Sequence, residues 1–144
     1  MSHKSARIAR LAAPVAERGL DVRYLGYFGC FNRQEFYEAH EVLEDLWLED
    51  RRGPNGAFYK GLIQLAGAFV HLQKDRLRPA AALLKLARGN LGHYPPVHEQ
   101  LGVAAVLTLA DDWLHRLEAA HFTQNPLSES TAPRLSLQVP AGPR

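Results

Sequence analysis

Apolar residues recur at spacings of three and four along most of the chain, which is the period of an amphipathic helix. This pattern predicts four helices, over residues 33–50, 56–74, 79–91 and 103–121. A further short helix fits residues 5–18, although Pro14 removes a backbone donor from its middle. Residues 19–31 are rich in aromatic residues and glycine, and we expect an ordered loop or a short helical turn there.

Two asparagines mark expected helix starts. Asn32, with Glu35 three residues later, has the form of a capping box, and Asn55 is the candidate N-cap of helix 56–74. Helix 56–74 is apolar around most of its circumference, so we expect it at the centre of the fold. No alternating pattern of useful length predicts a strand. The predicted fold is therefore all-α, a compact bundle of four to five helices with short connections.

The composition is that of one globular domain. The 144 residues are 47% hydrophobic and 22% charged, and a chain of this size can bury a core without disulfides or metals. The segment 123–144 differs from the rest, because it combines prolines and serines with few apolar residues. We expect it to be a flexible tail that adds little to the core.

Several functional classes are excluded by composition. A net charge of +2 is too small to indicate nucleic-acid binding, and no apolar run is long enough to span a membrane. The basic N-terminus makes a poor signal peptide. The single Cys30 excludes an internal disulfide and fits a cytoplasmic location, and we expect it to be a small buried hydrophobe. P-loop, G-x-S-x-G and dinucleotide-binding motifs are absent.

Charge is concentrated in one predicted helix. Every ionised residue from 35 to 50 is acidic: Glu35, Glu38, Glu41, Glu44, Asp45, Glu49 and Asp50. The simpler interpretation is a solvated helix face. The alternative is a surface that attracts a cation or the basic face of a partner.

The candidate chemistry lies on the other side of that helix. On a helical wheel His40 and Glu44 share the core-side shoulder with Tyr37 and Trp47, whereas most of the acids point to solvent. A histidine and a glutamate at i and i+4 can hold one ion together or act as an acid–base pair, and these ligands suit zinc, manganese or iron. The alternative is a structural pair covered by Trp47. A second histidine at position 44 would be needed for the zinc-protease motif.

A polar stripe runs along the otherwise apolar helix 56–74. It consists of Lys60, Gln64, Gly67, His71 and Lys74. Either the stripe is the exposed edge of a buried helix, or Gln64 and His71 face His40 and Glu44 across the helix pair. In the second case His71 is a third metal ligand or a base, and Gln64 orients it. We expect His93, His98 and His115 to be surface residues.

The residues from Phe31 to Trp47 resemble a bacterial and archaeal family, the domain of unknown function numbered 309. The resemblance rests on an H-x-x-x-E-x-x-W motif, met by His40, Glu44 and Trp47, and on a second segment from Gly61 to His71. It covers roughly residues 28–92. It implies a small all-helical fold with an unassigned activity and a suggested metal site. The chain then divides into a variable helix and loop (1–27), the helical domain (28–122) and the tail (123–144).

Two functional hypotheses follow. In the first, His40, Glu44 and His71 bind one divalent metal or a small polar ligand, with Tyr37, Trp47 and Gln64 around them. Such a site would suit a hydrolase that uses metal-activated water, with catalytic residues still unknown. In the second, the protein is a non-enzymatic interaction module, a homo-oligomer such as a homodimer, and the His40–Glu44–Trp47 cluster is a buried polar lock. An open site needs a solvent path to His40 and Glu44, whereas a lock needs both closed off.

Overall fold

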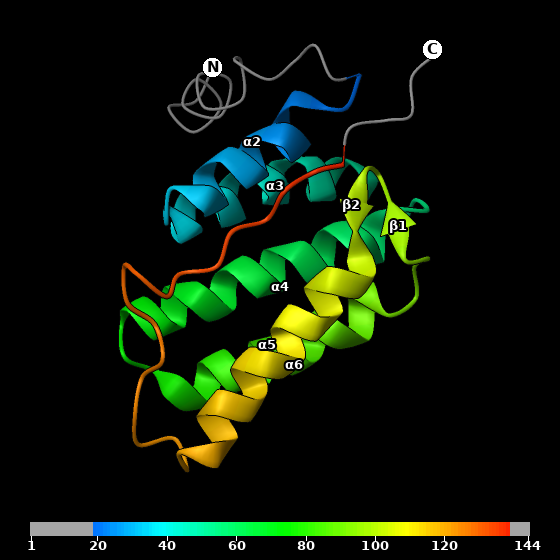
Figure 1. The fold of residues 1–144 in the computed structure, drawn as a ribbon. Helices are drawn as coiled ribbons and strands as arrows, with labels where there is room; N and C mark the ends of the chain where they lie inside the picture. Colours follow the sequence, from blue (N-terminus) through cyan, green and yellow to red (C-terminus); the bar gives the residue numbers. More distant parts are fainter. Residues whose placement is uncertain (1–18, 139–144) are drawn as a thin grey trace.

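The computed structural model describes residues 19–138, and the predicted helix 5–18 lies outside this range. The all-α prediction is confirmed, because five helices pack into a bundle and the only strands within the described residues form one short hairpin (Figure 1). The helices are α2 (Val22–Asn32), α3 (Phe36–Asp50), α4 (Gly56–Gln73), α5 (Leu77–Leu91) and α6 (Val103–Ala119). The strands are β1 (Val97–His98) and β2 (Leu101–Gly102).

The prediction of an ordered loop or a short helical turn over 19–31 is wrong, because most of this segment belongs to α2, a helix of 11 residues. The helix begins after Asp21, whose side chain accepts a hydrogen bond of 2.8 Å from the Arg23 backbone N–H. Its aromatic residues are buried, and Tyr27 donates from its hydroxyl to the Leu62 carbonyl of α4 at 2.7 Å. Packing of this face against the bundle outweighs the helix-weakening effect of the two glycines.

The predicted capping box at Asn32 is also wrong. Asn32 is the last residue of α2, and the chain turns at Gln34, whose φ is 65°. Glu35 takes the N-cap position of α3 without a side-chain capping bond. Asn55 does occupy the N-cap position of α4, but its side chain contacts other groups instead.

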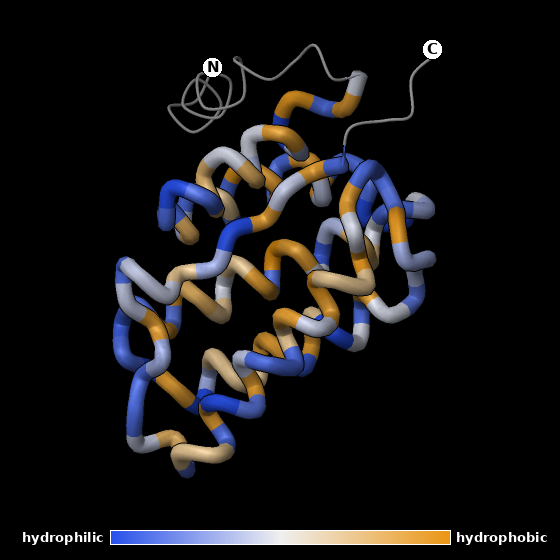
Figure 2. The backbone as a smooth tube through the Cα atoms, viewed as in Figure 1, coloured by the Kyte–Doolittle hydropathy of each residue, from blue (hydrophilic) through white to orange (hydrophobic). Residues whose placement is uncertain are grey.

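Helix α4 lies at the centre, as its apolar circumference predicts. It packs against α3 on one side and α5 on the other, while α2 packs on α3 and α6 on α5. Phe69 of α4 is fully buried and meets aromatic rings from α2, α3 and α6. Hydrophobic and hydrophilic residues alternate along the helices, and hydrophilic residues are frequent in the connections at the ends of the bundle (Figure 2).

The hairpin is a feature that the sequence pattern does not reveal. Its strands are two residues each, with Val97 opposite Gly102 and His98 opposite Leu101. The turn residues Glu99 and Gln100 both have positive φ, 51° and 62°, as a two-residue hairpin turn requires. The usual Asn-Gly signal for such a turn is absent here, so neither the spacing nor the residue types indicate it.

Residues 123–138, here called the return segment, run back along the bundle from the end of α6 to the hairpin (Figure 1). The Asn125 side chain donates to the Leu72 carbonyl at the end of α4, at 2.6 Å. Leu135 is 5% exposed and belongs to the core, and Leu137 bridges to Leu101 of β2. The expectation that this part of the tail adds little to the core is therefore wrong. Leu135 enters the core, and Leu127, Ala132 and Leu137 pack against it.

Asn32 holds the return segment in place. Its amide donates to the Leu135 carbonyl and accepts from the Leu135 backbone N–H, both at 2.7 Å. We predict that Asn32→Ala lowers the free energy of unfolding by about 1–2 kcal/mol, because two partly buried hydrogen bonds are lost. Urea denaturation measures this loss.

Hydrogen exchange at the Leu135 amide provides the control for this prediction. Protection of this amide should fall in Asn32→Ala but persist in Asn32→Asp, whose carboxylate still accepts the bond. Unchanged protection in the alanine variant would contradict the assignment.

Candidate functional site

A pocket of about 310 Å³ opens between α3, α4 and α5. It is lined by Tyr37 and His40 of α3, by Leu83 of α5, and by Lys60, Ile63, Gln64, Gly67, Val70 and His71 of α4. Four members of the predicted stripe on α4 thus line it, whereas Lys74 lies beyond the pocket and is exposed. The stripe is a pocket wall rather than only an exposed edge.

His40 is placed at the pocket by its position on the core-side shoulder of α3. Its Nε2 lies 3.4 Å from Oε2 of Glu44, one turn along the helix, and its ring stacks on Tyr37 at 5.9 Å between centroids. The two side chains of the pair are 30% and 34% exposed. The Nδ1 atom of His40 is shielded from solvent and has no hydrogen-bond partner among the described residues.

His71 lines the same pocket from α4. Its Nδ1 atom is likewise shielded and has no hydrogen-bond partner within residues 19–138. Burial lowers the pKa of His71 below its usual value of 6.5, and the charges of Arg76 and Lys74 lower it further. His71 is therefore held toward the neutral form, in which one ring nitrogen can accept a hydrogen bond.

Gln64 and Lys60 lie one helical turn apart on the wall of the pocket. The Oε1 atom of Gln64 accepts a hydrogen bond of 2.7 Å from the Asn90 amide of α5, which fixes the orientation of its own amide. The Lys60 ammonium lies over the Trp47 ring of α3, 4.4 Å from its centroid. Such a contact stabilises the cation without neutralising it.

The structure brings together four of the six predicted site residues. Tyr37, His40, Gln64 and His71 line one pocket, as expected if α4 turns its stripe toward α3. Glu44 and Trp47 do not line the pocket. Each contacts a residue that does: Glu44 contacts His40, and Trp47 contacts Lys60. Four further residues were not predicted as part of the site: the lining side chains Ile63, Val70 and Leu83, and Asn90, which orients Gln64.

The predicted three-ligand metal set is not assembled in this arrangement. Within residues 19–138, no three side chains of His, Cys, Asp or Glu form a group that could hold a metal ion. The imidazole and carboxylate of His40 and Glu44 are close enough to share one ion as two ligands. His71 lines the same pocket as His40 but does not join this pair as a third ligand within the described residues.

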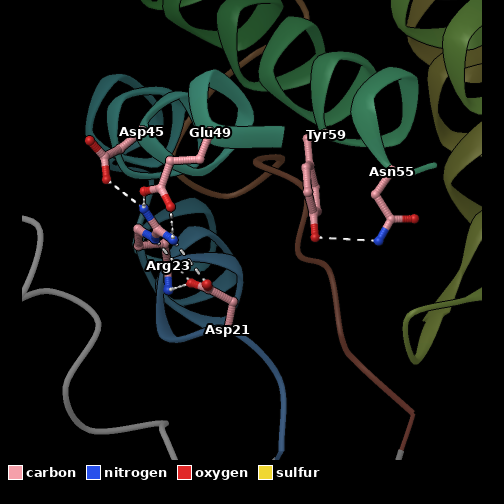
Figure 3. A network of polar contacts seen from close by, with 6 residues as sticks. All are labelled: Asp21, Arg23, Asp45, Glu49, Asn55 and Tyr59. Atoms are coloured by element: carbon pink, nitrogen blue, oxygen red, sulfur yellow. Dashed lines mark hydrogen bonds and ion pairs between the residues drawn. The ribbon is translucent and has the colours of Figure 1, made fainter. Parts of the chain in front are cut away.

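The acidic face of α3 is not simply solvated. Arg23 of α2 pairs with Asp45 at 2.8 Å and with Glu49, and Asp21 holds the same guanidinium at 3.0 Å (Figure 3). These carboxylates raise the pKa of Arg23 further above its usual value, so the charge is permanent. The network fastens α2 to α3 and satisfies two of the acids that the sequence places toward solvent.

The remaining histidine and cysteine predictions have mixed outcomes. Cys30 is fully buried, as predicted, and His93 and His115 are exposed. His98 is partly buried rather than exposed. Its Nε2 donates to the Asn55 side chain at 2.6 Å, and its ring packs on Phe58 at 4.7 Å between centroids. Asn55 in turn donates to the Tyr59 hydroxyl at 3.4 Å (Figure 3), so this cluster ties the hairpin to the start of α4.

The depressed pKa of His71 gives a pH prediction. The unfolded chain binds a proton at this residue near pH 6.5, whereas the native state does so only at lower pH. As pH falls below 6.5 the unfolded state therefore holds more protons, and the free energy of unfolding decreases. We expect His71→Gln to lose less stability than the wild type over this window, measured by urea denaturation at several pH values.

His93→Gln is the control, because His93 is exposed and lies outside the pocket. The charged or titratable groups near His71 are Lys74 directly after α4, Arg76 directly before α5, and His40 of α3, which lines the same pocket. Parallel pH profiles for the wild type and His71→Gln would contradict the prediction.

The fold and the pocket define a small helical-bundle protein with a partly open cavity between three helices. The family model described as "Domain of unknown function (DUF309)" matches residues 24–83, which confirms the resemblance predicted from the sequence. This span includes α3, α4 and the part of α5 that carries Leu83, and thus every residue that lines the pocket.

An uncharacterized protein, YpuF of Bacillus subtilis (strain 168), is 32% identical over 62 residues. The matched stretch covers 42% of this chain and 36% of that protein, so the chain spans about a third of the length of the curated relative it matches. No solved structure matches the chain. Within residues 19–138, no helix combines the length and apolar character needed to cross a membrane.

Proposed function

We propose that this protein binds a small polar ligand in the pocket between α3, α4 and α5. The observation that supports this most directly is the pair of unpartnered, shielded Nδ1 atoms of His40 and His71, whose rings line one cavity within the described residues. Buried polar atoms are nearly always hydrogen-bonded, so two exceptions in one place need a reason. A ligand bound against the two imidazole rings would supply such a reason.

The partial exposure of the His40–Glu44 pair favours a site over a structural lock. Both side chains are about one-third exposed, at 30% and 34%, whereas a lock requires them to be closed off. A polar pair with this exposure contributes about 0–1 kcal/mol. The interaction-module hypothesis, with its homodimer, therefore has less support, and light scattering coupled to gel filtration tests it.

A divalent cation at His40 and Glu44 is the second candidate, favoured by their 3.4 Å separation. Zinc, manganese and iron all accept this ligand pair. Hydrolase activity rests on this candidate, since a cation with two protein ligands would keep positions open for water and substrate. We also propose a cytoplasmic location, because Cys30 is a free buried thiol.

Glu44→Gln separates these possibilities. We expect the free energy of unfolding to change by less than about 0.5 kcal/mol, because the pair is partly solvated. If a cation binds, zinc uptake measured by calorimetry should be lost in Glu44→Gln and in His40→Ala, and kept in His115→Gln. A loss of about 1–3 kcal/mol in Glu44→Gln would instead support the lock.

A fragment screen tests ligand binding itself. The ¹⁵N-labelled protein is titrated with a library of neutral, anionic and cationic fragments, and amide shifts are mapped onto the structure. Val70→Phe adds bulk to the pocket wall, and Leu86→Phe adds the same ring at an exposed position of α5 that does not line the pocket. We expect hits that shift pocket residues and are lost only in Val70→Phe. The absence of hits, or hits that map elsewhere, would contradict the proposal.

A further inference from the structure

The polar groups that line the pocket are mostly hydrogen-bond donors. They comprise an ammonium, an amide, a phenol and two imidazoles, and none of the nine lining residues carries a carboxylate. The nearest carboxylate that the contacts identify is that of Glu44, which lies against His40. A site with this donor set lacks the negative charge that would hold a cationic ligand.

The charge of Lys60 has no carboxylate partner within residues 19–138. Its contact is the Trp47 ring, which leaves the positive charge available. Gln64 lies on the same face one turn later, and its oxygen is already occupied by Asn90. The NH₂ group of the Gln64 side chain is therefore available as a donor, and no described residue accepts a hydrogen bond from it. The Lys60 ammonium and the Gln64 amide therefore offer a positive charge and an oriented hydrogen-bond donor to the oxygens of one anionic head group.

The rest of the pocket wall is apolar. Ile63 and Val70 of α4 and Leu83 of α5 contribute side chains, and Gly67 between them contributes none. A Cβ at Gly67 would lie 3.1 Å from the Leu83 side chain, so this glycine keeps the floor of the pocket open. A short hydrocarbon group can lie along this wall with its apolar surface removed from water.

Of the three helices around the pocket, α4 and α5 add positive charge, whereas the ionised residues of α3 are acidic. Between residues 51 and 98 the only acid is Asp75, against eight basic residues: Arg51, Arg52, Lys60, Lys74, Arg76, Arg78, Lys85 and Arg88. Lys85 and Arg88 are partly neutralised by Glu118 and Asp111 of α6, but both partners lie outside the pocket. An anion that enters between α4 and α5 therefore approaches the basic side of the pocket, where Lys60 lies.

From these observations we infer that the ligand is an amphipathic anion, a carboxylate or phosphate monoester with a short apolar body. Its head group binds Lys60 and Gln64, and its body lies along Ile63, Gly67 and Leu83 toward His71. This inference rests on the proposed function. It adds the charge of the ligand, its amphipathic character and its orientation in the pocket.

Four probes with the same six-carbon chain test the inference: hexanoate, hexyl phosphate, hexanamide and hexylammonium. Binding to the full-length protein is followed by amide shifts of the pocket residues. We expect the two anions to bind at least about tenfold more tightly than hexanamide, and hexylammonium to bind most weakly. The ratio of hexanoate to hexyl phosphate distinguishes the two head groups.

Lys60→Met removes the charge but keeps an unbranched side chain of similar reach. We expect it to abolish the preference for anions over hexanamide, and Gln64→Leu to reduce it. Lys74→Met is the matched control, because Lys74 lies on the same stripe beyond the pocket and should change the preference less than twofold. Circular dichroism confirms that each variant is folded.

The outcomes separate this inference from the proposed function. If hexanamide or hexylammonium binds in the pocket as tightly as the anions, the inference is overturned and the proposed function stands. An anion preference that survives Lys60→Met, or that Lys74→Met removes equally, also overturns it. If none of the four probes shifts the pocket residues, while fragments of other chemistry do, the inference alone fails. If nothing binds there, both fail.

Discussion

Phe69→Ala is expected to lower the free energy of unfolding by about 3–5 kcal/mol. Phe69 is fully buried in α4, and its ring lies 5.7 Å from Phe31, 5.2 Å from Phe36 and 5.0 Å from Trp113, between centroids. These partners belong to three different helices, so they cannot all move into the space that the ring leaves. The loss is large because a domain is stable by only about 5–15 kcal/mol in total.

Urea denaturation measures the effect, with Leu48→Ala as the control. Leu48 lies on α3 but is 52% exposed, and its truncation should cost less than about 0.5 kcal/mol. A loss below about 1 kcal/mol in Phe69→Ala would mean that the aromatic cluster does not join the four helices.

Gly61→Val is expected to destabilise the protein by about 3 kcal/mol, because α5 side chains leave no room for a Cβ at this residue of α4. A Cβ here would lie 2.7 Å from Cγ of Leu91 and 3.2 Å from Cβ of Asn90. Leu91 is fully buried and cannot give way, so the helices must separate. Because Asn90 orients Gln64, we also expect weaker binding of any pocket ligand.

Gly89→Val is the matched control for this prediction. Gly89 lies in α5, is exposed and has nothing within 4 Å of an added Cβ. Valine is a slightly better helix former than glycine, so stability should change little or rise by a few tenths of a kcal/mol. Equal losses of unfolding free energy in the two variants would show that replacing any glycine is destabilising, and would contradict the role of close helix packing at Gly61.

The central part of the fold follows from the sequence because its signals are local. Helix α4 is apolar on most sides, and the predicted span 56–74 agrees with the observed Gly56–Gln73. Helix α2 was missed because an aromatic, glycine-containing segment is compatible with a loop. Its helical form is stabilised by burial of the aromatic residues in the bundle, which the local sequence does not reveal. Asn32 was misassigned for the same reason, since its partner Leu135 lies 103 residues away.

The candidate site was predictable only as far as it lies on single helices. The stripe from Lys60 to His71 and the pair His40–Glu44 follow from helical spacing, and the pocket joins them. The contribution of α5 through Leu83 and Asn90 depends on how helices pack, which spacing within one helix does not encode. The partial neutralisation of the acidic face by Arg23 is likewise a contact between helices.

The central claim is that His40 and His71 line a ligand site, and their imidazole nitrogens test it most directly. Long-range ¹H–¹⁵N spectra report every histidine side chain of the protein at once. On addition of hexanoate or hexanamide, we expect the nitrogen signals of His40 and His71 to move together while those of His93 and His115 stay fixed. If a probe binds while the His40 and His71 signals remain unchanged, or if all four histidines respond alike, the pocket is not the binding site.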